Sequence, residues 1–210
     1  KDDQVSMSTG KAVSTGTNQA VPISYYRQFD TGQTVIASTT KATSADDYVS
    51  KGIEKRNRGD FEGSIADLNM AIAINPQYAD AYNNRGFAKN KLGDYQGAIA
   101  DFNKAIEINP QHAYAYYNRG VAKYDLKDYQ GAISDYSKAI EINPQLAEAY
   151  SNRGVAKYDL KDYQGAIADY TKAIQINPQY AYAYNNRGNA KLKLGDYQGA
   201  IADYNKALAI

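Results

Sequence analysis

The sequence predicts an all-α protein built from stacked helix pairs, preceded by a segment of different composition. Asn-Pro recurs with a period of 34 residues, from Pro76 to Pro178. Within one period, from Ala98 to Ile108, apolar residues are spaced three, four and seven positions apart, which places them on one face of a helix. Such a face needs a neighbour, so the regular period predicts that each helix pair packs on the next.

Composition excludes several classes of protein. The 210 residues contain no cysteine, which excludes disulfide frameworks, thiolate zinc sites and cysteine nucleophiles. The formal charge is +1, so the sequence has no electrostatic preference for nucleic acid or for an anionic membrane. The apolar runs are too short to span a bilayer. We therefore expect no nucleic-acid partner and no membrane insertion.

Residues 1–44 differ from the rest of the chain. They include 14 serines and threonines, no leucine and no copy of the 34-residue unit. Two stretches, 21–26 and 34–39, are rich in β-branched and aromatic residues and flank a turn-forming sequence, which predicts an extended, β-like segment. An isolated hairpin is marginally stable, so we expect it to pack on the helices or on another copy. The residues expected to make such assembly contacts are Val21, Ile23, Tyr25, Tyr26, Phe29, Val35 and Ile36.

The first residue is Lys1 rather than methionine, which we interpret as a sign of a processed or trimmed chain. A secreted or extracytoplasmic protein fits this observation together with the absence of cysteine and the serine- and threonine-rich beginning. A cytoplasmic protein fits the same observations, so the sequence does not decide the compartment.

Placing each proline at position 32 divides the remaining chain into five units. They span 45–78, 79–112, 113–146, 147–180 and an incomplete 181–210. Every unit has tyrosine at position 4, glycine at position 8 and alanine at position 27, with a small residue at position 20 and a bulky one at position 24. This unit resembles the tetratricopeptide repeat (TPR). The resemblance implies a right-handed α-solenoid of helix-turn-helix repeats and a role in protein interaction.

The turn inside each repeat is also specified by sequence. Gly93 followed by Asp94 supplies a glycine at the end of one helix and an aspartate at the start of the next. Lys127 and Lys161 replace this glycine in repeats 3 and 4. The proline at position 32 ends the second helix, because the residue before proline is disfavoured in helical geometry.

Two positions depart from the TPR pattern. Position 7 holds Arg85 and its equivalents in place of a large apolar residue, and position 11 holds lysine where the family often has tyrosine. Aspartate occupies position 23 of every repeat. Because a partly buried arginine needs a carboxylate partner, we expect a ladder of Arg-Asp pairs with a structural role.

No group of residues predicts catalysis. Asp30-Thr31-Gly32 resembles the short motif of aspartic proteases, but a single copy is better interpreted as a turn. His112 is the only histidine, and it lies in an expected loop. Without a second histidine or a cysteine, we expect no transition-metal site, no cofactor and no enzymatic activity.

The resemblance implies a concave surface lined by positions 2, 5, 6, 9, 12 and 13 of the first helices. Tyrosine and asparagine dominate these positions, a composition typical of adaptable recognition surfaces. Family members that clamp a C-terminal carboxylate use groove cations, but Arg56, Lys91 and Lys193 are scattered among the repeats, which argues against such a clamp. The expected partner-binding residues are Asn83, Asn84, Phe87, Asn90, Tyr114, Tyr117, Asn118, Val121, Tyr124, Ser151, Asn152, Val155, Tyr158, Tyr182, Asn185 and Asn186.

Two functions remain open at this point. The first is a non-enzymatic scaffold that binds a protein or peptide segment in the concave groove. The alternative is a structural subunit that forms oligomers or filaments, because the apolar face of the last expected helix has no following helix to cover it. In that case the N-terminal segment would link one copy to the next.

Overall fold

The computed structural model describes residues 44–210, and this part of the chain contains ten helices and no strand. The helices are α1 (Ala45–Asn57), α2 (Phe61–Ile74), α3 (Ala79–Lys91), α4 (Tyr95–Ile108), α5 (Ala113–Asp125), α6 (Tyr129–Ile142), α7 (Ala147–Asp159), α8 (Tyr163–Ile176), α9 (Ala181–Lys193) and α10 (Tyr197–Leu208). The expected extended segment and its assembly contacts lie outside the described residues.

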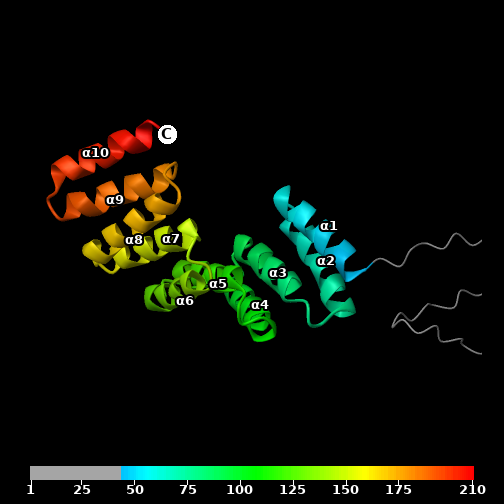
Figure 1. The fold of residues 1–210 in the computed structure, drawn as a ribbon. Coiled ribbons are helices and arrows are strands. Elements are labelled where there is room, and N and C mark those ends of the chain that lie inside the picture. The colour runs from blue at the N-terminus through cyan, green and yellow to red at the C-terminus, as the bar shows by residue number, and fades with distance from the viewer. Residues whose placement is uncertain (1–43) are drawn as a thin grey trace, which may run out of the picture. The chain divides into compact units, whose positions relative to one another are not determined.

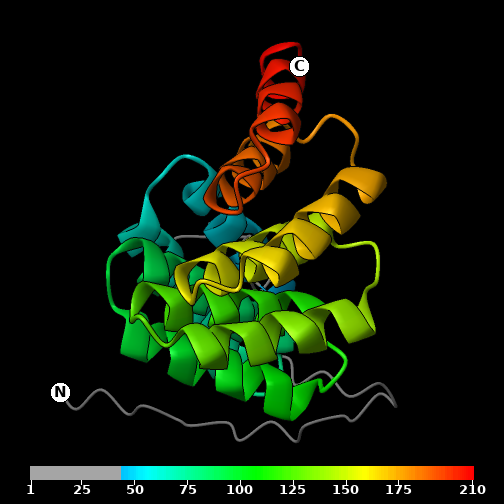
Figure 2. The same ribbon diagram turned by 90° about the vertical axis from the view of Figure 1, so that its left-hand side faces the viewer.

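Each repeat is an antiparallel helix pair that stacks on the next pair (Figures 1 and 2). The two helices of a repeat contact each other, and the second helix also contacts the first helix of the following repeat, as α4 contacts α5. First helices of successive repeats also touch, as α3 touches α5. The expected α-solenoid is confirmed for the described residues.

Close approach inside a repeat depends on the glycine at position 8. A Cβ atom on Gly120 would lie 2.7 Å from Cε1 of the Tyr136 ring and 3.3 Å from the carbonyl oxygen of Ala132. The ring of Tyr136 therefore packs directly on the backbone of α5. Tyr136 is 1% exposed and the alanine at position 27, Ala139, is fully buried, so these positions form the interior of the repeat.

The turn between the two helices of a repeat follows the predicted chemistry. Asp128 caps α6 by accepting a hydrogen bond from the backbone N–H of Gly131. The residue two positions after α3 is Gly93, with φ of +83°. In repeats 3 and 4 the equivalent Lys127 and Lys161 adopt the same left-handed conformation, with φ of 67° and 66°, which is unfavourable for a residue with a side chain.

The predicted ladder of Arg-Asp pairs is confirmed. In repeat 3, Arg119 donates two hydrogen bonds to Asp135, Nε to Oδ2 at 2.9 Å and Nη2 to Oδ1 at 2.6 Å. Nη1 of Arg119 also donates to Asn103 of the preceding repeat at 2.7 Å. Repeats 2, 4 and 5 have the same double contact between position 7 and position 23.

The lysine at position 11 is a second partner of the same aspartate, which the sequence did not predict. Lys123 Nζ lies 2.8 Å from Asp135 Oδ2, and repeats 2, 4 and 5 repeat this ion pair. Repeat 1 differs, because Lys55 alone pairs with Asp67, at 2.7 Å. Four carboxylates are thus held between two cations each, and one is held by a single cation.

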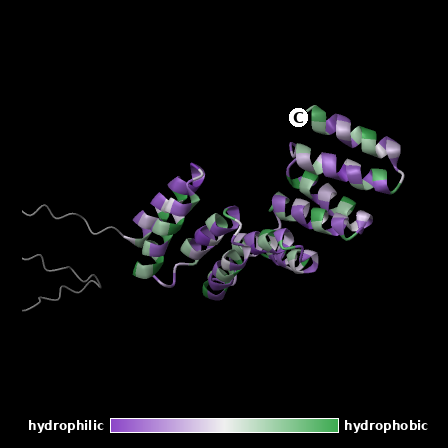
Figure 3. Ribbon diagram, turned by 180° about the vertical axis from the view of Figure 1, so that it is seen from behind, coloured by the Kyte–Doolittle hydropathy of each residue, from purple (hydrophilic) through white to green (hydrophobic). Residues whose placement is uncertain are grey.

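The two end helices of the described solenoid differ in character. On α10, Tyr197, Ile201 and Leu208 are 64%, 52% and 85% exposed, although the same positions pack beneath the next helix in earlier repeats. Figure 3 shows the hydrophobic residues at this end of the chain in green. On α1, by contrast, Asp47 and Glu54 occupy positions 3 and 10, where every later repeat has alanine. The outer side of α1 is therefore polar.

Candidate functional site

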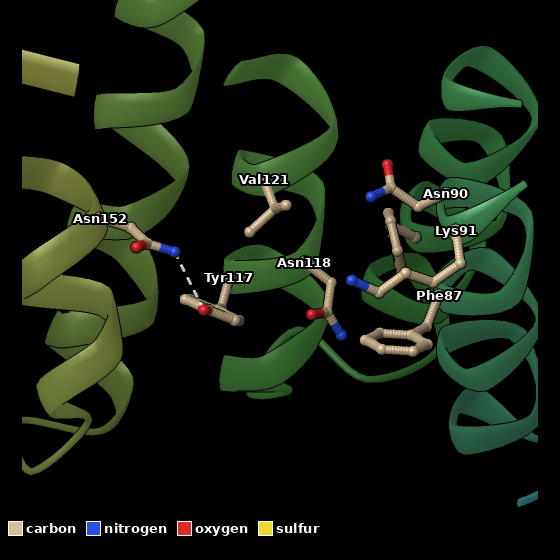
Figure 4. A pocket seen from close by; sticks show the side chains of 8 residues that line it. Phe87, Asn90, Lys91, Tyr117, Asn118, Val121 and Asn152 are labelled. Carbon is tan, nitrogen blue, oxygen red and sulfur yellow. Dashed lines mark hydrogen bonds between the residues drawn. The ribbon is translucent and has the colours of Figure 1, made fainter. Parts of the chain in front are cut away.

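A hollow of about 150 Å³ lies on the concave side, where the first helices of repeats 2, 3 and 4 meet (Figure 4). Its apolar surface comes from Phe87 on α3, Val121 on α5 and the tip of Phe102 on α4. Amide and hydroxyl groups surround this apolar patch, together with one lysine. The polar lining residues are Asn90, Lys91, Tyr117, Asn118 and Asn152.

Hydrogen bonds between neighbouring first helices hold the polar lining in place. Asn152 on α7 donates to the hydroxyl of Tyr117 on α5 at 3.0 Å, a contact drawn in Figure 4. Asn118 donates to Oδ1 of Asn83 on α3 at 3.0 Å. Each bond joins position 6 of one repeat to position 5 of the repeat before it. The bonded side chains are therefore oriented before any ligand arrives.

One polar atom at the hollow has no partner. Asn90 donates through Nδ2 to Asp125 on α5 at 3.4 Å. Its Oδ1 atom is buried and accepts no hydrogen bond from the described residues. An unsatisfied buried acceptor is unfavourable, and a ligand that carries an N–H group would relieve it.

Two cations flank the aromatic ring of Phe87. The guanidinium carbon of Arg56 lies 5.2 Å from the ring centroid, and Lys91 Nζ lies 5.4 Å from it. Arg56 also donates to Asn84 at 2.6 Å. Within residues 44–210 neither cation forms an ion pair with a carboxylate, whereas the cations of the ladder all do. This side of the hollow is therefore positively charged and open to an anionic group.

Tyrosines dominate the concave side of the later repeats. Tyr114 and Tyr182, at position 2 of repeats 3 and 5, are 53% and 52% exposed. Tyr124 on α5 donates from its hydroxyl to Asp159 on α7 at 2.5 Å. Burial raises the pKa of Tyr117 to about 12, so this hydroxyl stays neutral at physiological pH. These rings supply large, rigid contact area with hydrogen-bonding tips.

The structure divides the expected partner-binding residues into three groups. Those that line the hollow are Phe87, Asn90, Tyr117, Asn118, Val121 and Asn152. Those that are partly or largely exposed elsewhere on the first helices are Tyr114, Tyr124, Val155, Tyr158, Tyr182, Asn185 and Asn186. Those that are buried are Asn83, Asn84 and Ser151.

The buried group corrects the expectation of direct partner contact at these positions. Ser151 is fully buried beside Tyr180, which comes from the loop before α9. Asn83 and Asn84 are occupied by their bonds to Asn118 and Arg56. Short side chains at these positions are covered by the neighbouring repeat, so they orient other residues.

Sequence reasoning missed three contributors to the hollow. Phe102 comes from a second helix, and its position was assigned to the interior of the repeat. Arg56 and Lys91 were noted only as scattered charges, because their common approach to Phe87 depends on how repeats 1 and 2 stack. The signal that could have indicated them is their lack of an acidic residue at ladder spacing.

The described residues offer no other chemical centre. No cluster of histidine and acidic side chains among residues 44–210 could hold a metal ion. His112 accepts a hydrogen bond from the backbone N–H of Ala115 and contacts Asp80 at 3.0 Å, a structural role at the start of α5. None of the helices in this part of the chain is long and apolar enough to cross a membrane.

Comparison with solved structures supports the fold. A crystal structure of MamA is 29% identical, with a TM-score of 0.68, and the match covers 75% of this chain and 92% of MamA. PilF of Pseudomonas aeruginosa is 21% identical, with a TM-score of 0.74 and coverage of 79% and 75%. YrrB, described as a TPR protein with an unusual peptide-binding site, is 20% identical, with a TM-score of 0.64 and coverage of 80% and 87%. No curated protein matches the chain significantly.

Family models match most of the chain. The tetratricopeptide repeat model matches residues 79–112, 113–146, 147–180 and 181–210, and a second TPR repeat model matches residues 52–93. These matches agree with the helix pairs, the glycine at position 8 and the alanine at position 27 described above. The chain belongs to the tetratricopeptide repeat family.

Proposed function

We propose that this protein is a non-enzymatic scaffold that binds an extended segment of a partner protein on its concave side. The hollow between α3, α5 and α7 carries this proposal, because three successive repeats contribute to a single concave patch that is apolar at its base and polar at its edge. Binding sites for small groups commonly have this composition. The TPR fold is generally used for protein interaction, and the printed description of YrrB as peptide-binding points in the same direction.

The charges around the hollow indicate the chemistry of the partner. An apolar side chain fits against Phe87 and Val121, while a neighbouring acidic residue would meet Arg56 and Lys91. The partner segment is therefore expected to carry an apolar residue next to aspartate or glutamate. Ion pairs at an exposed rim affect the association rate and salt dependence more than the affinity.

An array of 12-residue peptides, acetylated and amidated, tests this function with the full chain. The array varies one apolar and one acidic position, and the tightest binder is measured in solution by fluorescence polarisation. Val121→Phe, which fills the hollow, and Lys91→Glu, which reverses its charge, are each expected to weaken binding at least tenfold. The matched control is Lys193→Glu, because Lys193 occupies the same repeat position on α9, at the other end of the described solenoid.

Thermal unfolding followed by circular dichroism separates lost binding from lost structure. A variant that binds poorly but melts within about 2 °C of the wild type supports the proposal. The groove function is wrong if no peptide binds, or if Lys193→Glu weakens binding as much as Lys91→Glu.

Self-assembly is a second candidate, favoured by the exposed apolar face of α10. Head-to-tail stacking would bury the polar side of α1, including Glu54, against that face, which costs free energy. Contact through α10 of both copies avoids this cost. Light scattering over a concentration series tests the idea: a dimer that Ile201→Glu abolishes supports it, and a monomer at every concentration rejects it.

A further inference from the structure

Two tyrosines in the later repeats carry buried hydroxyl groups that lack a partner. Tyr136 on α6 and Tyr170 on α8 occupy position 24 of repeats 3 and 4, and each is 1% exposed. Within residues 44–210 neither hydroxyl makes a hydrogen bond. A buried polar group without a partner destabilises a protein, so most such groups in native structures are satisfied.

The side chains at this position point towards the concave side. The ring of Tyr136 crosses Gly120 and lies 5.9 Å, centroid to centroid, from the ring of Tyr117, which lines the hollow. In repeat 5 the equivalent Tyr204 donates from its hydroxyl to Oδ1 of Asn189 at 2.8 Å. Asn189 stands at position 9, one of the concave positions of the first helix.

The residue at position 9 explains why two hydroxyls are unsatisfied and one is not. In repeats 3 and 4 this position holds Val121 and Val155, which cannot accept a hydrogen bond, whereas repeat 5 has Asn189. Repeats 1 and 2 avoid the problem, because Leu68 and Phe102 replace tyrosine at position 24. An acceptor for the hydroxyls of repeats 3 and 4 must therefore come from outside the described chain.

The surrounding charges select a neutral acceptor. Asp125 and Asp159 stand at position 13 of repeats 3 and 4, and Glu148 stands at position 2 of repeat 4. Burial raises the pKa of both Tyr136 and Tyr170, and nearby carboxylates raise it further, so both hydroxyls stay protonated donors. An acidic side chain would be repelled here, but a backbone carbonyl would not.

We propose that Tyr136 and Tyr170 donate hydrogen bonds to backbone carbonyl groups of the partner segment, which runs in extended form from the hollow across repeats 3 and 4. This inference rests on the proposed groove function. Packed helices lie about 8–10 Å apart, and an extended chain rises about 3.3 Å per residue. The two contacted carbonyls are therefore about three residues apart.

Removal of single oxygen atoms from the full chain tests the inference. The probe is the tightest binder from the blocked 12-residue peptide array. Tyr136→Phe and Tyr170→Phe are each expected to weaken its binding roughly three- to tenfold, the effect of one hydrogen bond. Both variants should melt at or above the wild-type temperature, because each loses an unsatisfied buried group. Tyr204→Phe is the matched control, since its hydroxyl already has a partner, and its affinity should be unchanged.

A set of peptides with single amide-to-ester replacements identifies the acceptor, because an ester carbonyl accepts hydrogen bonds poorly. One replacement should weaken binding to the wild type but not to Tyr170→Phe, and a second should behave in this way with Tyr136→Phe. If Val121→Phe weakens binding while both tyrosine variants bind like the wild type, the groove function stands and this inference is wrong. If no peptide binds, both proposals fail.

Discussion

Replacement of Asp135 by alanine is expected to destabilise the solenoid more than replacement of either of its partners. The Asp135 side chain is 5% exposed, and its cations Arg119 and Lys123 are 18% and 24% exposed. Removal of one partner from a fully buried pair costs about 3–5 kcal/mol. Because the two cations retain some contact with water, we expect about 2–3 kcal/mol for Asp135→Ala. At about 2–4 °C per kcal/mol for a chain of this size, the melting temperature should fall by roughly 8 °C.

The other variants of the ladder supply the controls. Arg119→Leu should cost no more than about 1 kcal/mol, because Lys123 still pairs with Asp135 and leucine packs well in a partly buried position. Asp67→Ala should also cost about 1 kcal/mol, since Asp67 pairs only with the 39% exposed Lys55.

Urea unfolding and hydrogen exchange measure these differences. Hydrogen exchange is needed because a repeat protein can unfold in parts, and it should show the loss of protection centred on α5 and α6. The ladder would not be a buried ionic network if Asp135→Ala cost no more than Asp67→Ala. It would also be refuted if Arg119→Leu cost as much as Asp135→Ala.

Three further predictions concern the turn, the helix contact and pH. Lys127→Gly should stabilise by about 0.5–1 kcal/mol, because glycine adopts the observed φ of 67° without strain; an unchanged urea midpoint would contradict this. Gly120→Ala should destabilise by about 1–3 kcal/mol, because the new Cβ meets the Tyr136 ring at 2.7 Å; wild-type melting would show that the helices can separate freely. Burial alone would raise the pKa of Asp203, but hydrogen bonds from Arg187 and its neighbouring lysine lower it. The stability this carboxylate provides is therefore present above about pH 4 and lost below it, and Asp203→Asn should reduce the acid dependence of the urea midpoint.

The sequence predicted the repeating parts of the structure well. The period of Pro76 and its equivalents located the helix pairs, and the recurrence of Arg85 with Asp101 indicated the ladder. These features depend on contacts within one repeat or across one interface, and each occurs several times in the sequence. Repetition makes such contacts readable, because a pairing that must work in four repeats leaves few alternatives.

The hollow and its charges were only partly predictable. Val121 and Asn152 were expected on the concave side, but the approach of Arg56 to Phe87 depends on the angle between two repeats. The burial of Ser151 likewise depends on the next repeat, which covers it. The periodic pattern places a residue on a face of its helix, and the rotation between repeats then decides which side chains from different repeats meet.

The hydrogen bond from Arg119 back to Asn103 has a mechanical consequence. Each ladder arginine grips the aspartate of its own repeat with two N–H groups and the preceding repeat with a third. When the ends of the solenoid are pulled apart, the load therefore passes from repeat to repeat through these side chains as well as through apolar packing. The molecule should extend like a spring whose coils open one repeat at a time, and the arginine latches set the force at which each coil opens.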